Sequence, residues 1–310
     1  MDLCNPRTVR ELMDRFGLAP KKSYGQNFLI NPLIPERIAQ SASGGYAAPY
    51  SADAVFCDGV ALEIGPGIGA MTRELAARFE KVIAIEIDDA LIPLLGETLG
   101  DLDNVTVIHG DFMKTDLADL LEKEAKGRPV HVCANLPYYI TTPVLMKLLE
   151  SFPMTGISPI KSITVMVQTE VADRICADEN SRDYGALSVS LALHGKAEKL
   201  FTVAPGNFLP PPKVSSSVVR IALFEGGIYD LWKEAPVDPT ECQNFAERVK
   251  ETVKEAFLQR RKTLTNALGS KYPKTAVADA LEKMGKRTDL RGEKLSALDY
   301  CVLTSLLCEK

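Results

Sequence analysis

The tetrapeptide Asn135-Leu136-Pro137-Tyr138 is the motif in this sequence that indicates one kind of chemistry most specifically. An amine attached to an aromatic ring is a poor nucleophile, because its lone pair is delocalised into the ring. The side-chain oxygen of Asn135 and the backbone carbonyl of Leu136 can accept the two hydrogens of such an amine, and Pro137 fixes the turn. Tyr138 can stack on a base extruded from a nucleic acid. The tetrapeptide therefore predicts methylation of a base amine, with an ordinary turn after a strand as the plain alternative.

A glycine-rich turn, Glu63–Gly69, precedes two carboxylates at the spacing of a nucleoside site. Glycines at positions 65 and 67 let the backbone approach a ligand that a Cβ would block. Glu86 follows Gly65 by 21 residues, the spacing at which a carboxylate accepts two hydrogen bonds from a ribose. Asp111 follows the next apolar run, where an adenine amino group would lie. The pattern favours S-adenosylmethionine as the cofactor.

The same turn also fits the dinucleotide fingerprint, because Gly65, Gly67 and Ala70 match G-x-G-x-x-A. An NAD-dependent oxidoreductase is therefore an alternative. Pro66 counts against it, since proline stiffens the loop and removes an amide donor that a pyrophosphate needs. Asp111 also suits a nucleoside without phosphates.

Short apolar runs precede each of these polar residues and alternate with helical stretches. The runs lie at residues 60–64, 82–85, 105–108, 130–134 and 162–167. This alternation predicts an α/β domain, with a doubly wound, mostly parallel sheet and helices on both faces. Because ligands bind at the carboxyl edge of such a sheet, we expect four strand ends to share one site. These ends carry Gly65, Glu86, Asp111 and Asn135.

The rest of the chain divides into a sheet edge, a linker and a helical tail. Residues 199–203 and 217–223 predict two further strands in a hairpin-like edge. Gly226-Gly227 and the prolines that follow mark a linker, and only helical patterns occur from about residue 240. We therefore predict a catalytic domain at residues 1–225 and a small all-α domain at residues 240–310.

Between the two edge strands lies Phe208–Val214, a proline-set loop with an aromatic ring and a cation. Phe208 can cover the second face of an extruded base, and Lys213 can contact a phosphate. Taken alone, the loop is equally consistent with a polyproline connector.

Composition is that of a globular protein, with 46% hydrophobic and 25% charged residues. No apolar run approaches the roughly 18 residues of a membrane span, and the chain opens without a basic, apolar leader. We expect a cytoplasmic protein without a membrane partner. The cysteines contain no Cys-x-x-Cys pair and the three histidines are scattered, so we expect no metal site.

Together the motifs resemble the ribosomal RNA adenine dimethyltransferases. The matching segments are Gln26–Leu29, Glu63–Gly69, Glu86, Asp111, Asn135–Tyr138 and Phe208–Val214. The tail segment Phe257–Leu264 is similar to that of the branch acting on small-subunit rRNA, the kasugamycin-resistance methyltransferases. Ser41–Asp58 and Gly226–Asn244 are longer than expected of the family.

The resemblance implies a Rossmann-like, S-adenosylmethionine-dependent enzyme. It implies dimethylation of the 6-amino groups of two adjacent adenosines near the 3′ end of small-subunit (16S) rRNA, late in assembly of the subunit. It also implies cofactor contacts at Asn27, Leu29, Gly65, Glu86, Asp111 and Asn135. The glycine-rich turn adds Gly67 to these candidate cofactor contacts. A large-subunit rRNA methyltransferase of antibiotic resistance shares most motifs, and an assembly factor that acts mainly by binding is a further alternative.

An acidic protein, with a net charge of −5, must concentrate its cations to hold RNA. Each basic cluster taken alone is more typical of a solvated helix face, and only the combination of the clusters with a base-binding site favours RNA contact. The candidates are Lys21, Lys22, Lys213, Arg260, Arg261 and Lys262, with Lys286, Arg287 and Arg291 nearby in the tail. We expect a monomer whose partner is small-subunit rRNA or the immature small subunit.

Overall fold

The computed structural model describes residues 1–20, 25–44, 56–152, 158–232 and 244–308, which form two compact units. The first unit comprises Met1–Phe152, Pro159–Ala172 and Glu198–Ala222, and the second consists mainly of Asp173–Ala197 and Leu223–Lys310. Among the described residues, no helix has the length and hydropathy needed to cross a membrane.

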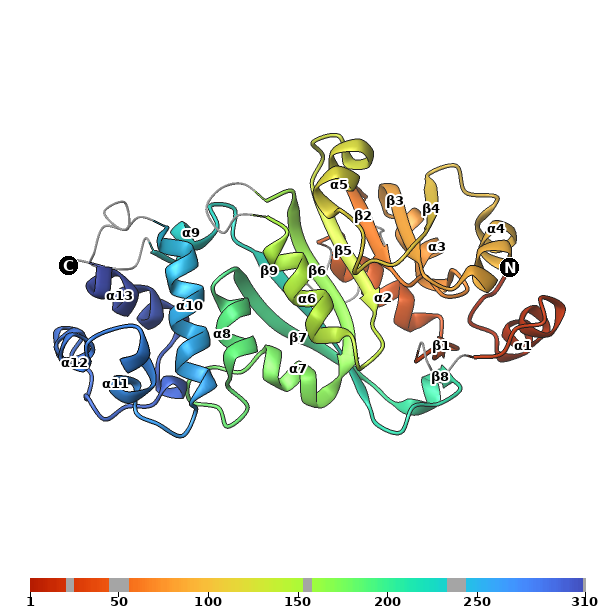
Figure 1. The fold of residues 1–310 in the computed structure, drawn as a ribbon. Helices are drawn as coiled ribbons and strands as arrows, with labels where there is room; N and C mark the ends of the chain where they lie inside the picture. The colour runs from red at the N-terminus through yellow and green to blue at the C-terminus, as the bar shows by residue number, and fades with distance from the viewer. Residues whose placement is uncertain (21–24, 45–55, 153–157, 233–243, 309–310) are drawn as a thin grey trace. The chain divides into compact units, whose positions relative to one another are not determined.

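A seven-stranded sheet forms the centre of the first unit, in the order β4-β3-β2-β5-β6-β9-β7 (Figure 1). The strands are β2 (Cys57–Ile64), β3 (Phe79–Glu86), β4 (Val105–His109), β5 (Val130–Asn135), β6 (Ile160–Gln168), β7 (Gly195–Val203) and β9 (Ser216–Leu223). Strands β2 to β6 pair in parallel, whereas β9 runs antiparallel to β6. The predicted α/β fold with a mostly parallel sheet is confirmed, and β9 and β7 form the predicted edge.

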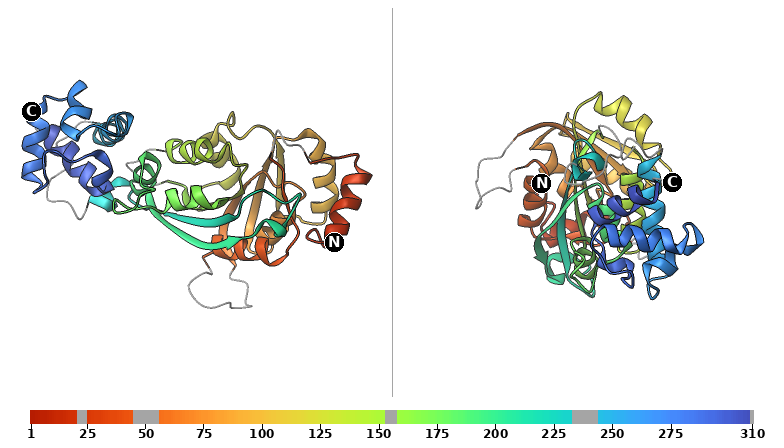
Figure 2. Two further views of the ribbon diagram at one scale, coloured as in Figure 1. Left: turned by 90° about the horizontal axis from the view of Figure 1, so that it is seen from below. Right: turned by 90° about the vertical axis from the view of Figure 1, so that its left-hand side faces the viewer.

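Helices cover both faces of this sheet (Figure 2). They are α2 (Leu33–Ala42), α3 (Ala70–Ala76), α4 (Ile92–Leu99), α5 (Leu117–Ala125), α6 (Thr141–Glu150) and α7 (Thr169–Ile175). Helix α1 (Pro6–Arg15) belongs instead to an apolar cluster with Phe28, Ile68 and Leu94. The central strands are apolar almost throughout because both of their faces are buried. On one face, Ala61, Val82 and Cys133 belong to a core cluster that includes side chains of α2 and α3.

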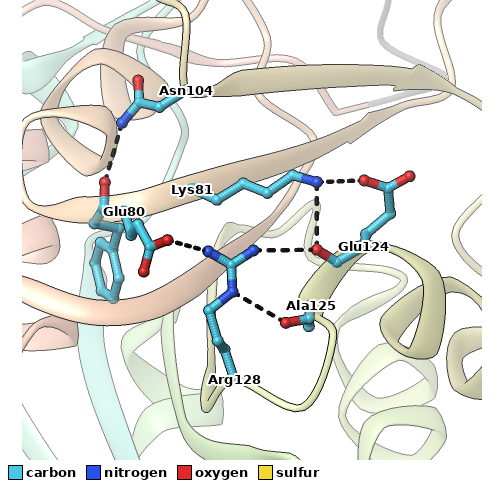
Figure 3. A network of polar contacts seen from close by, with 7 residues as sticks. Glu80, Lys81, Asn104, Glu124, Ala125 and Arg128 are labelled. Carbon is cyan, nitrogen blue, oxygen red and sulfur yellow. Dashed lines mark hydrogen bonds and ion pairs between the residues drawn. The ribbon is translucent and has the colours of Figure 1, made fainter.

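A polar network fixes the amino ends of the strands, opposite the edge where ligands are expected (Figure 3). Lys81 at the start of β3 forms an ion pair with Glu124 of α5. Arg128, just before β5, bonds Glu80 at 2.6 Å and the carbonyl of Ala125 at 3.1 Å. These contacts join β3 to the α5–β5 turn. They therefore help to fix the positions of β3 and β5, whose other ends lie at the carboxyl edge.

Where the structure describes it, the second unit has no strand residues other than the start of β7 and the last residue of β9. Its helices are α8 (Ala186–Ala192), α9 (Ile228–Trp232), α10 (Phe245–Leu258), α11 (Leu264–Ala267), α12 (Lys274–Lys283) and α13 (Ala297–Cys308). The Tyr184 hydroxyl donates to the Leu295 carbonyl at 2.9 Å, and the Tyr300 hydroxyl donates to the Gly292 carbonyl at 2.9 Å.

The boundary between the units differs from the predicted division at residues 225–240. Residues 173–197 belong to the helical unit, because Tyr184, Val189 and Leu193 are buried in the same apolar cluster as α10 and α13. Sequence order placed this segment with the strands on either side of it.

Candidate functional site

A cavity lies at the carboxyl edge of the sheet, within the first unit. Side chains from the ends of β2, β3, β4 and β5 line it, together with the N-terminal segment and one residue of β8 (Phe208–Leu209). The predicted set that lines it is Asn27, Leu29, Gly65, Gly67, Glu86, Asp111, Asn135, Leu136, Pro137, Tyr138 and Phe208. The structure therefore brings together residues that are up to 181 positions apart in the sequence.

The glycine turn between β2 and α3 has a backbone that other residues rarely adopt. Gly65, Gly67 and Gly69 have φ angles of +72°, +61° and +91°, where a Cβ is strained. A Cβ on Gly67 would also lie 3.4 Å from the ring of Phe28. The turn thus forms a backbone wall that leaves room for a ligand.

Glu86 ends β3 and braces this turn. It is 4% exposed, and its two oxygens accept the Gly67 amide at 3.2 Å and the Asp88 amide at 2.8 Å. Burial raises the pKa of Glu86, and these two amide donors oppose the rise. A carboxylate held in this way can accept hydrogen bonds from two vicinal hydroxyls.

Asp111 follows β4 and presents a second carboxylate to the cavity. Its Oδ1 accepts the Met113 amide at 2.9 Å, and its Oδ2 lies 3.8 Å from the Lys114 ammonium. One oxygen therefore fixes the loop, and the other can accept a hydrogen bond from a ring amine.

The N-terminal segment holds Asn135 at the end of β5. The Asn135 side-chain nitrogen donates to the Asn27 carbonyl at 3.3 Å, and the Asn27 side chain donates in turn to the Gly25 carbonyl at 2.9 Å. A Cβ on Gly25 would lie 3.1 Å from Pro137. Because the nitrogen of the Asn135 amide is engaged, its oxygen is the atom left to accept hydrogens from a ligand.

Tight local contacts fix the turn after Asn135. The Leu136 amide donates to the Met166 carbonyl of β6 at 3.2 Å, and the Ile140 amide donates to the Pro137 carbonyl at 3.1 Å. The Tyr138 hydroxyl lies 3.3 Å from the hydroxyl of Ser216 at the start of β9. The acceptors at the cavity are thus preorganised by the backbone.

Phe208 is 3% exposed and lies in a two-stranded sheet that the sequence pattern did not predict. Strand β1 (Phe28–Leu29) pairs antiparallel with β8, and Leu29 is opposite Phe208. The N-terminal segment that contains Leu29 and the loop that contains Phe208 are therefore joined in one small sheet.

Two polar residues of the site lie in segments that the sequence analysis named, but no individual role was predicted for either. The Gln26 side chain donates to the Asp88 carboxylate at 2.8 Å, which ties the N-terminal segment to the end of β3. Glu63 lines the cavity, is fully buried, and has no hydrogen-bond partner for either oxygen within the described residues. Burial raises the pKa of Glu63 to about 8, and the negative charge of Glu86 adds to this rise. An acidic residue inside an apolar run was the signal available for Glu63.

The predicted RNA contacts have different environments. Lys21 and Lys22 lie outside the described residues. Lys213, Arg261 and Lys262 are exposed. Arg260 instead bonds within the helical unit, to the Glu293 carboxylate at 3.0 Å and the Tyr184 carbonyl at 3.0 Å. In the described ranges, no group of three or more His, Cys, Asp or Glu side chains is arranged to hold a metal ion.

Comparison with known proteins gives consistent matches over nearly the whole chain. The family model of ribosomal RNA adenine dimethylase matches residues 17–307. The ribosomal RNA small subunit methyltransferase A of Bacillus licheniformis is 40% identical over 317 residues, which cover 99% of this chain and 98% of that protein. The protein of the same name from Lachnoclostridium phytofermentans is 37% identical over 313 residues, with 99% and 98% coverage.

Two solved structures have a similar fold. The crystal structure of the 23S rRNA methyltransferase ErmE is 25% identical with a TM-score of 0.66, and covers 91% of this chain and 99% of that one. A dimethyladenosine transferase from Plasmodium falciparum is 24% identical with a TM-score of 0.67, and covers 89% and 95%.

Proposed function

Because the chain belongs to the ribosomal RNA adenine dimethylase family, we propose that it dimethylates the 6-amino groups of two adjacent adenosines near the 3′ end of small-subunit rRNA. The methyl donor is S-adenosylmethionine, whose sulfonium supplies an electrophilic methyl group. The full-length relatives named for the small subunit are 37% and 40% identical to this chain, whereas the 23S rRNA methyltransferase is 25% identical. This difference favours the small subunit over the large.

The orientation of the Asn135 amide is the observation that supports methyl transfer best. Its nitrogen is held by the Asn27 carbonyl, so its oxygen is left to accept hydrogens from the amine that must be polarised. With the Leu136 carbonyl, this oxygen can accept both hydrogens of an adenine amino group and direct the nitrogen lone pair toward the methyl. The nitrogen becomes acidic once it is methylated, so no strong base is required.

The residues present fit the proposed cofactor. The Glu86 carboxylate can accept the two ribose hydroxyls, and Asp111 can accept the amino group of the cofactor adenine. The turn at Gly65 and Gly67 leaves space that a side chain would fill. The segment containing Asn27 and Leu29 covers this part of the cavity.

Two aromatic residues are placed to hold the target base. Tyr138 and Phe208 line the cavity beside Asn135, and a base taken out of its stack needs aromatic or apolar faces to replace its lost neighbours. The cations Lys213, Arg261 and Lys262 are exposed and can contact phosphates of the immature small subunit. We propose that the enzyme acts on it as a monomer.

Labelled S-adenosylmethionine and small subunits that lack adenine methylation provide the test. We expect label in two adjacent adenosines near the 3′ end of the rRNA, and none with Asn135→Ala. Label in large-subunit rRNA alone would overturn the proposed substrate. Normal subunit assembly by Asn135→Ala without methylation would assign the main role to binding. Affinity for NADH without affinity for S-adenosylmethionine would favour an oxidoreductase.

A further inference from the structure

Two consecutive tyrosines follow the Asn135 turn, and their environments differ sharply. Both line the cavity. Tyr138 is partly buried, and its hydroxyl lies 3.3 Å from the Ser216 hydroxyl. Tyr139 is 63% exposed, and its side chain makes no hydrogen bond or ring contact with the described part of the chain. The base clamp proposed above uses Tyr138 and Phe208 and leaves Tyr139 without a role.

The backbone beneath Tyr139 is held firmly. The Pro137 carbonyl accepts the Ile140 amide at 3.1 Å and the Thr141 hydroxyl at 3.3 Å, so Tyr139 lies inside a closed turn at the start of α6. An aromatic side chain that is exposed on a fixed turn at the margin of a cavity contributes little to the stability of the fold. Such a ring is well suited to contact a partner through its face.

A cation and an exposed apolar residue lie a few residues from Ser216, the hydrogen-bond partner of Tyr138. Ser216, which contacts Tyr138, begins β9, and the two exposed residues Lys213 and Val214 lie just before it in the chain. A cation for the phosphate backbone beside an aromatic ring for a base is the combination that binds single-stranded RNA. The carboxylates proposed to hold the cofactor lie at the carboxyl ends of β3 and β4. Tyr139 instead follows β5, on the side of the cavity proposed for methyl transfer.

We propose that Tyr139 forms a second base subsite: its ring stacks on the nucleotide that flanks the target adenosine in the RNA strand. This inference rests on the proposed function, because extrusion of one base unstacks its neighbour and leaves a face that Tyr139 can cover. Tyr139 is then a substrate-positioning residue, and it contributes to binding of RNA and not of cofactor.

Two variants of Tyr139 separate ring stacking from other roles. Tyr139→Leu keeps an apolar side chain but removes the aromatic face, and Tyr139→Phe keeps the face but removes the hydroxyl. Tyr229→Leu is the matched control, because Tyr229 is a partly exposed tyrosine of the helical unit, 40% exposed. Each protein is assayed for KM and kcat on unmethylated small subunits and, by calorimetry, for its Kd for S-adenosylmethionine.

We expect Tyr139→Leu to raise KM for small subunits about tenfold and to leave the Kd for the cofactor unchanged. Tyr139→Phe and Tyr229→Leu should stay within about twofold of wild type. An unchanged KM in Tyr139→Leu would overturn the subsite, as would an equal defect in Tyr139→Phe, which would indicate a hydroxyl hydrogen bond. A raised cofactor Kd in Tyr139→Leu would assign the ring to the cofactor site instead. If wild type does not methylate small subunits, the proposed function itself fails, which is a separate result.

Discussion

Lys147 of α6 holds the loop after β4 through two carbonyl oxygens. Its ammonium donates to the Met113 carbonyl at 2.9 Å and to the Thr115 carbonyl at 2.6 Å. The loop carries Asp111, and α6 directly follows the turn that carries Asn135. One side chain therefore connects the proposed adenine contact for the cofactor to the proposed methyl-transfer site.

Replacement of Lys147 by methionine should weaken cofactor binding about tenfold. The variant keeps an aliphatic stem of similar length but leaves two carbonyls without their charged donor, and hydrogen bonds to a charged group are worth roughly 1.5–3 kcal/mol. Calorimetric titration with S-adenosylmethionine provides the measurement. Lys123→Met is the control, because Lys123 forms an exposed ion pair with Asp119 on α5. Equal Kd values for the two variants would mean that the Lys147 contact does not support the cofactor loop.

Glycine at position 25 should matter for the rate of methyl transfer. A Cβ at Gly25 would meet Pro137 at 3.1 Å, whereas a Cβ at Gly17 would have no atom within 4 Å, and the two residues have similar φ angles of +57° and +62°. Gly25→Ala and Gly17→Ala thus impose comparable backbone strain, but only the first presses on the Asn135 turn.

We expect Gly25→Ala to lower kcat about tenfold at saturating cofactor, since small displacements of reacting groups cost large factors in rate. Gly17→Ala should keep the wild-type kcat in the same assay on small subunits. A similar fall in both variants would attribute the effect to strain alone.

Much of the fold could be predicted from the sequence, because each buried strand is a short apolar run that ends in a polar residue or glycine. The runs before Gly65, Glu86, Asp111 and Asn135 all became neighbouring parallel strands. The position of residues 173–197 could not be predicted, since it depends on which apolar side chains pack together over long range, as Tyr184 and Leu295 do in one buried cluster.

The cavity was predictable to a similar degree. The carboxyl ends of parallel strands lie at one edge of the sheet, so the motif residues at these ends could be predicted to line one cavity. No individual role was predicted for Gln26, Lys147 or Glu63, because the role of each depends on a partner or on burial that no local pattern encodes. Arg260 shows the converse: a basic run suggested a free cation, and the folded chain pairs it with Glu293.

Ionisation of Glu63 should make the folded protein less stable as the pH rises. Burial raises the pKa of Glu63 from a usual value of about 4.5 to about 8, so the folded state binds an additional proton between these two pH values. Stability therefore falls as pH rises through this window and is level above it. Between pH 5.5 and 8.5, wild type should lose roughly 3 kcal/mol more than Glu63→Gln, which cannot ionise.

Urea unfolding of both proteins at the two pH values measures this difference. Glu74→Gln is a suitable control, because Glu74 pairs with Arg78 on the outside of α3 and its side chain is 35% exposed. Parallel pH profiles for wild type and Glu63→Gln would show that the Glu63 carboxyl does not titrate in this range.

The adjacent arginines Arg260 and Arg261 of the helical unit should have different roles. Arg260 bonds Glu293 and the Tyr184 carbonyl, whereas Arg261 is exposed and forms no hydrogen bond or ion pair within the described residues. Arg260→Ala should lower the free energy of unfolding by about 1 kcal/mol, the scale of an exposed ion pair with one further hydrogen bond. Arg261→Ala should leave stability unchanged but weaken binding to small subunits and reduce its dependence on salt, because one phosphate contact is lost. Thermal unfolding and filter binding at several salt concentrations measure the two effects, and an exchange of the two phenotypes would contradict this division of roles.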